Sequence, residues 1–257
     1  MLIVSPQLLF AFLLVLARVA GVIAFLPLPG SSLFPGNVKV VLALLLTLIL
    51  LPVAATRGLA TAGFWTIVLW MAREAGFGVS IGLAFDLLGE MLGFAAQMLG
   101  FQAGYSYINT VDPTSQVDAT ILNVVLTLLG GLLFFAFDLH LELIRVLARS
   151  LETMPVGEPA AAANAWLPAL GMTRLGGAML DTAVRLALPV VAVLLLLDLA
   201  LALLSYVNAR MQLLSLSFPI KMLITMLSLT AIVGLAPHLY QELARRAIEV
   251  SYTLIRR

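Results

Sequence analysis

Long apolar segments most strongly constrain what this chain can fold into. Six of them follow one another, each near or above the roughly 20 residues that a transmembrane helix needs. They span approximately residues 6–26, 38–54, 64–105, 119–151, 175–206 and 218–255. Only 11% of the 257 residues are charged and 62% are hydrophobic, whereas a soluble domain carries about 25% charged residues. The sequence therefore predicts an all-α polytopic membrane protein with about six hydrophobic helices in hairpins.

The remaining composition narrows the kinds of site that the chain can hold. It has no cysteine, and its two histidines, His140 and His238, are far apart in sequence. A thiol-ligated or histidine-rich metal site is therefore not expected, and no cofactor is predicted. The net charge of +1 and the lack of a basic cluster argue against a nucleic-acid partner. The one linker-like stretch, residues 152–173, is too short to be a domain, so residues 1–257 are predicted to form a single membrane-embedded domain with no soluble domain.

Glycines recur at intervals of eleven residues in the third apolar segment. The two series are Gly78, Gly89 and Gly100, and Gly82, Gly93 and Gly104. Because eleven residues make almost three helical turns, all six glycines share one helix face. A face without side chains lets another helix backbone approach closely. We expect this face to be a site of tight helix packing.

A polar segment follows the glycines where apolar sequence is expected. Residues 100–113 read GFQAGYSYINTVDP and end in an Asp-Pro pair, which disfavours helix. Irregular backbone at membrane depth is tolerated only where it is buried in protein or lines a water-filled cavity. The segment therefore predicts a pore or gate. The candidate residues are Phe101, Gln102, Gly104, Tyr105, Tyr107, Asn109, Asp112 and Pro113.

Ionisable residues lie inside the apolar segments, where a charge at the bilayer centre costs about 2.5–3.5 kcal/mol on insertion scales. Asp181 and Arg185 share a helix face, as do Asp138 and Glu142. Arg18 and Asp198 have no partner nearby in sequence, so we expect partners in other helices or subunits. Two interpretations stay open: an ion relay, and salt bridges that hold an assembly together, which we prefer. The candidate residues for assembly are Arg18, Asp138, Asp198 and Lys221.

The last apolar segment is expected to begin as a helix at Phe218 and Pro219. Proline suits an early helix position, where its missing N–H has no partner to lose. Lys221, two residues further on, would then extend to the membrane interface.

One stretch matches a catalytic motif. Residues 78–82 read GVSIG, the G-x-S-x-G pattern of a nucleophile elbow. That motif requires a strand, a turn and a helix in a soluble sheet, but here it lies in an apolar helix. An intramembrane protease would also need a catalytic partner for Ser80, and none is evident. No enzymatic activity is predicted.

Several motifs together resemble the FliR family of the flagellar type III secretion system. They are Gln102-x-Gly104 followed by Val111-Asp112-Pro113, the Phe218-Pro219-Ile220-Lys221 start of the last segment, and residues 16–21 running into residues 27–30. Each motif alone has low specificity, but their order, spacing and the length of the chain match along essentially the whole sequence.

The resemblance implies a non-enzymatic core subunit of the flagellar protein export gate, in the bacterial inner membrane at the flagellar basal body. It implies a hetero-oligomeric helical assembly with FliP-like, FliQ-like, FlhB-like and FlhA-like proteins, through which unfolded flagellar subunits pass. The segment that matches residues 101–113 is implied to plug the pore. An assembly raised out of the bilayer would also explain the charges within apolar segments.

The main alternative is a secondary transporter with a broken helix at its substrate site. Such transporters are commonly built from inverted repeats, but no convincing repeat relates residues 1–110 to residues 119–257. Purification separates the two hypotheses, because a transporter would need no partner proteins.

Overall fold

The computed structural model describes residues 6–26, 36–54, 63–104, 121–157, 167–207 and 213–255. These residues form helices and no strand, as the apolar segments predict. The helices are α1 (Pro6–Ala24), α2 (Gly36–Leu50), the short 3-10 helix η1 (Leu51–Val53), α3 (Phe64–Ala103), α5 (Ile121–Ala136), α6 (Leu139–Thr153), α7 (Leu167–Val207) and α8 (Leu213–Ile255). Five helices are long and apolar enough to cross a membrane, and the bent pair α5–α6 makes a sixth candidate.

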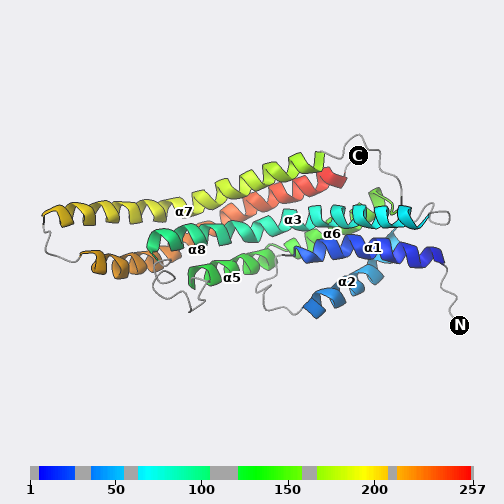
Figure 1. Ribbon diagram of the computed structural model, residues 1–257, viewed down its shortest axis with the longest axis horizontal. Helices are drawn as coiled ribbons and strands as arrows, with labels where there is room; N and C mark the ends of the chain where they lie inside the picture. Colours follow the sequence, from blue (N-terminus) through cyan, green and yellow to red (C-terminus); the bar gives the residue numbers. More distant parts are fainter. Residues whose placement is uncertain are drawn as a thin grey trace.

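The helices form an elongated bundle in which α3, α7 and α8 run along the long axis (Figure 1). The central helix is α3, which packs against α1, α5, α7 and α8. Helix α1 lies along the first half of α3 and α5 lies near its second half (Figure 1). The end of α7 and the start of α8 lie together at the end of the bundle opposite the N-terminus (Figure 1). The residues that end α3 therefore face the α7–α8 pair.

The core follows α3, while much of α7 and α8 is left exposed. Fully buried side chains on α3 include Phe85, Leu88, Met91, Leu92 and Leu99. Exposed large apolar side chains on the α7–α8 pair include Leu196, Leu203, Tyr206, Leu223 and Leu227. Exposed apolar surface of this extent is typical of a chain that faces lipid or other protein subunits.

The fourth apolar segment is not one continuous helix, contrary to the expectation for residues 119–151. Helices α5 and α6 are bent by 62° relative to each other. The break lies at Asp138, whose φ of 54° interrupts the α-helical backbone between α5 and α6. Aspartate is one of the few residues besides glycine that adopts this left-handed conformation. Asp138 therefore occupies the N-cap position of α6, where its exposed side chain makes no capping hydrogen bond. It does not share a continuous helix face with Glu142.

The boundaries of the last two helices also differ from the prediction. Helix α8 begins at Leu213, so Pro219 lies inside it and Phe218 does not start it. Pro219 has no N–H to donate to the carbonyl of Ser215, so α8 passes this position without one of its backbone hydrogen bonds. Helix α7 begins at Leu167, eight residues before the expected start near Leu175, because residues 167–174 are mostly good helix formers.

Candidate functional site

The first half of α3 packs backbone to backbone against α1. A Cβ added at Gly82 would lie 2.7 Å from the carbonyl oxygen of Val22, and one added at Gly78 would overlap the carbonyl of Arg18. On α1, a Cβ added at Gly21 would lie 2.6 Å from the carbonyl oxygen of Ala75. The close contact at Gly21 was not predicted from the sequence, although Gly21 lies four residues after Ala17. Two small residues at this spacing are common at helix interfaces in membranes.

The next glycines of α3 face α5. A Cβ added at Gly130 of α5 would lie 3.9 Å from the Cα of Gly89, and one added at Gly93 would lie 3.8 Å from Oδ1 of Asn123. Gly100, eleven residues after Gly89, is buried. The glycine face of α3 therefore contacts α1 along its first half and α5 along its second.

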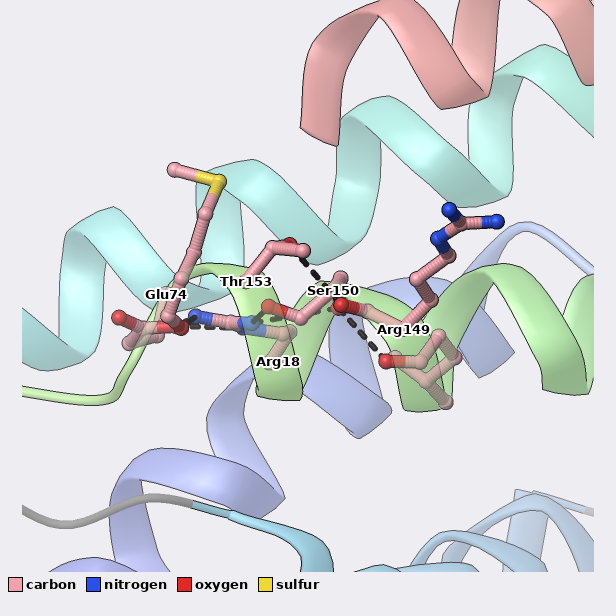
Figure 2. Close-up of polar contacts among 7 residues, drawn as sticks. Arg18, Glu74, Arg149, Ser150 and Thr153 are labelled. Carbon is pink, nitrogen blue, oxygen red and sulfur yellow. Dashed lines mark hydrogen bonds and ion pairs between the residues drawn. The ribbon is translucent and has the colours of Figure 1, made fainter. Parts of the chain in front are cut away.

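Arg18 joins α1, α3 and α6 in a buried cluster (Figure 2). Its Nη2 lies 2.5 Å from Glu74 Oε2, and its Nε donates to the same oxygen over 2.6 Å. The Arg18 Nη1 donates to two atoms of Ser150, the carbonyl oxygen over 2.9 Å and the Oγ over 3.2 Å. The Arg18 Nη2 donates to the carbonyl oxygen of Met154 over 3.1 Å. The guanidinium also lies 5.1 Å from the ring centroid of Phe77.

This cluster confirms that Arg18 finds its partner in another helix. The carbonyls of Ser150 and Met154 lie at the C-terminal end of α6, where helix carbonyls carry partial negative charge. The Ser150 carbonyl also accepts the Met154 backbone N–H over 3.0 Å, so the guanidinium is its second donor. A guanidinium has five N–H donors in a fixed fork, which suits it to bind a carboxylate and two carbonyls at once. The site is a structural junction of three helices.

A second junction, which we name the Asp198 cluster, consists of Gln102, Asp198 and Lys221. The Lys221 Nζ lies 2.6 Å from Asp198 Oδ1, and Gln102 Nε2 donates to Asp198 Oδ2 over 3.2 Å. The three residues come from α8, α7 and α3, so the partners of Asp198 also lie in other helices, as expected. Lys221 is bound to Asp198 and only 14% exposed, so it does not extend freely to an interface.

The end of α3 lies beside this cluster. Gly104 ends the helix with a φ of 84°, and its N–H donates to the carbonyl oxygens of Gly100 and Phe101. Glycine is favoured at such a left-handed C-terminal position. A Cβ added at Gly104 would lie 2.8 Å from a ring carbon of Phe218, so α3 ends directly against α8. Phe101 is exposed.

The structure thus brings together five of the predicted residues, namely Gln102, Gly104, Asp198, Phe218 and Lys221. Asp138 lies apart from them, at the α5–α6 break. Five other residues predicted for the gate lie outside the described residues, namely Tyr105, Tyr107, Asn109, Asp112 and Pro113.

Other charged contacts among the described residues include pairs within one helix and a contact between α6 and α8. Arg185 and Asp181 form an exposed ion pair of 3.0 Å on α7, as their spacing predicted. Glu142 pairs with Arg145 at 3.0 Å and accepts a hydrogen bond from the Tyr252 hydroxyl over 2.9 Å. Among the described residues, no group of three or more histidine, aspartate or glutamate side chains could hold a metal ion.

Residues 9–247 match the family model of the bacterial export proteins, family 1. The flagellar biosynthetic protein FliR of Pectobacterium carotovorum subsp. carotovorum is 29% identical over 232 residues, which are 88% of this chain and 86% of that protein. FliR of Escherichia coli is 29% identical over 233 residues, which are 89% of this chain and 87% of that protein. FliR of Aquifex aeolicus is 24% identical over 232 residues, or 88% and 86%. Because the family model matches nearly the whole chain, the protein belongs to the bacterial export proteins of family 1, in agreement with the resemblance to FliR.

Proposed function

We propose that the protein is a non-enzymatic core subunit of a flagellar type III export gate in the bacterial inner membrane, at the flagellar basal body. In this role it helps to form the pore through which unfolded flagellar subunits pass, and residues 101–113 occlude that pore at rest. The relatives named as flagellar biosynthetic proteins and the family of export proteins support the general role.

The observation that carries the pore-occluding role is the anchored end of α3. The Asp198 cluster and the ring of Phe218 both contact α3 within its last residues and its cap, Gly104. The polar segment therefore begins from a fixed point where three long helices meet. We propose that Phe101, Tyr105 and Tyr107 fill the closed pore. In the same proposal the polar groups of Gln102, Asn109 and Asp112 hold the segment in place.

The exposed surface of α7 supports a role within an assembly. Asp181 and Arg185 are 53% and 62% exposed in the middle of an apolar helix, where contact with lipid would be costly. Neighbouring protein subunits remove that cost by covering the pair with polar groups. We propose FliP-like and FliQ-like subunits as the direct neighbours, with FlhB-like and FlhA-like proteins in the same apparatus.

Deleting Ser106 to Thr110 tests the pore-occluding role. The deletion should leave α3 and its anchor intact but shorten the segment, so membrane vesicles that carry the assembled apparatus should conduct ions at rest. Vesicles with the unchanged protein at the same amount of assembled complex are the control. If the shortened protein assembles and the vesicles stay as tight as the control, the segment does not occlude a pore.

A further inference from the structure

Helix α6 differs from the spanning helices in its charge and its direction. It carries Glu142, Arg145, Arg149 and Glu152 within 15 residues, whereas α5, the helix before it, carries no charged residue in 16. It is also bent by 62° from α5. Charges as dense as these are costly in the hydrocarbon core but not at the boundary between lipid and water, where amphipathic helices lie in the plane of the membrane. Helix α6 therefore suits the membrane surface.

The outward face of α6 combines cationic and apolar side chains. Arg145 is 70% exposed, and Arg149, one turn further on, is exposed as well. Leu141 and Ile144 lie beside Arg145 on the helix surface and are 43% and 37% exposed. In a helix at a membrane surface, apolar side chains enter the acyl layer while arginines reach the headgroups. Both kinds of side chain are present here within two turns.

The two arginines have one carboxylate partner between them. Glu142 pairs with Arg145 at 3.0 Å and accepts the Tyr252 hydroxyl of α8 over 2.9 Å. The Arg149 guanidinium lies 5.4 Å from the centroid of the Tyr252 ring. It extends away from the buried Arg18 cluster (Figure 2), and among the described residues no carboxylate forms an ion pair with it. One positive charge is therefore left over where α6 meets α8.

The adjoining end of α8 adds to this positive charge. Arg245 is exposed and precedes Tyr252 by seven residues, almost two turns, so both residues share one face of α8. The exposed acids of this region, Glu152 and Glu249, form no ion pair with Arg149 or Arg245 in the described part of the chain. The guanidinium donors of both arginines are therefore available to an anion from outside the chain.

We propose that Arg145 and Arg149 bind the phosphate of an anionic phospholipid, whose acyl chains lie against Leu141 and Ile144. Tyr252 is the positioning residue, because its ring holds the Arg149 guanidinium and its hydroxyl holds Glu142. A guanidinium presents its N–H donors in a fixed fork that matches phosphate oxygens. A lipid fits this surface better than free phosphate does, because free phosphate has no apolar part to cover the two exposed aliphatic side chains.

Lipid binding to the purified full chain tests the site. Native mass spectrometry with added phosphatidylglycerol or phosphatidylcholine counts the lipids bound and gives their affinities. We expect Arg145→Gln combined with Arg149→Gln to weaken phosphatidylglycerol binding about tenfold, because hydrogen bonds between charged groups are lost. The matched control is Arg185→Gln, which removes an exposed arginine of α7 and should leave the affinity unchanged. Equal affinities of the double variant and the unchanged protein would overturn the proposal.

Glu142→Gln tests the site in the opposite direction. The new amide oxygen still accepts the Tyr252 hydroxyl, but the charge that competes for Arg145 is gone. We expect phosphatidylglycerol to bind several-fold more tightly, whereas a purely structural role of the Glu142–Arg145 pair predicts no gain. The midpoint of thermal unfolding is measured for every variant, so that a loss of folding is not mistaken for a loss of binding. Unchanged or weaker binding by a folded Glu142→Gln variant contradicts the site.

A photoreactive side chain distinguishes a lipid from other occupants. p-Benzoylphenylalanine is placed at Leu141, beside Arg145, in cells that express the full chain with its neighbouring membrane proteins. Illumination should add the mass of one phospholipid to the chain. A crosslink to a neighbouring protein instead would assign the surface to a subunit and overturn the lipid site. Inorganic phosphate is the last comparison: if it raises the unfolding midpoint as much as phosphatidylglycerol does, the arginines bind free phosphate and the proposal fails.

Discussion

At the residue scale, the protein uses ionisable side chains as junctions between helices. Arg18 binds Glu74 on α3 and the carbonyls that end α6, all in a buried site. Each charge compensates the other, so removing one partner leaves the second buried without a counterion. Such a loss typically destabilises a protein by about 3–5 kcal/mol, whereas removing both charges together is often nearly neutral.

Arg18→Met is therefore expected to lower the midpoint of thermal unfolding in detergent markedly, because it leaves the Glu74 carboxylate buried without a counterion. Combining it with Glu74→Leu should recover much of the loss. The control is Arg185→Met, which breaks an exposed pair and should cost about 1 kcal/mol or less. Equal midpoints for Arg18→Met and the unchanged protein would show that the buried pair does not stabilise the fold.

At the element scale, α3 organises the bundle through its glycine face. Gly78 and Gly82 meet the backbone of α1, and Gly89 and Gly93 lie against α5. Because the contacted atoms at Gly78 and Gly82 are backbone, a side chain there cannot be accommodated by a change of rotamer. The α1–α3 interface must open instead, and α1 carries Arg18 with it.

Gly82→Ala is expected to destabilise the protein by about 1–3 kcal/mol, the range for overpacking a close contact. The matched control is Gly76→Ala on the same helix, since an added Cβ at Gly76 has nothing within 4 Å. That control should be neutral or stabilising, because alanine favours helix over glycine by about 1 kcal/mol. Denaturant unfolding in detergent measures the free energy of unfolding of both variants. Equal values would mean that the close contact at Gly82 does not resist an added methyl group.

At the scale of the whole molecule, α7 and α8 expose many large apolar side chains. Large side chains such as Leu196, Leu203 and Leu227 are exposed there, and the charged pair Asp181–Arg185 interrupts the apolar face of α7. A surface that is apolar but locally charged suits contact with other subunits better than contact with lipid alone. In the proposed assembly, this chain is one part of a larger bundle.

A tagged copy expressed with the neighbouring membrane proteins of its operon is expected to be extracted as a large hetero-oligomer that contains FliP-like and FliQ-like subunits. Native mass spectrometry of the purified complex measures its mass and composition. The same chain expressed alone is the control. A monomer or homodimer in both preparations would contradict the assembly and favour the transporter alternative, which substrate-binding assays would then test.

The sequence by itself determined the helical membrane class, the family and the ion pairs between residues one turn apart, such as Asp181 and Arg185. These properties depend on hydropathy, spacing and order along the chain, which are local. It also indicated that α3 presents a glycine face, because helical periodicity alone aligns residues eleven apart.

Only the tertiary structure decided which helices the buried charged and polar side chains contact. Arg18 binds Glu74 across 56 residues and Ser150 across 132, and Gln102 binds Asp198 across 96. The break at Asp138 and the start of α8 before Pro219 also had no clear signal, because a left-handed aspartate and a proline inside a helix are both uncommon. Long-range pairing depends on how helices approach one another, and that approach is fixed by the shapes of packed surfaces rather than by any short stretch of sequence.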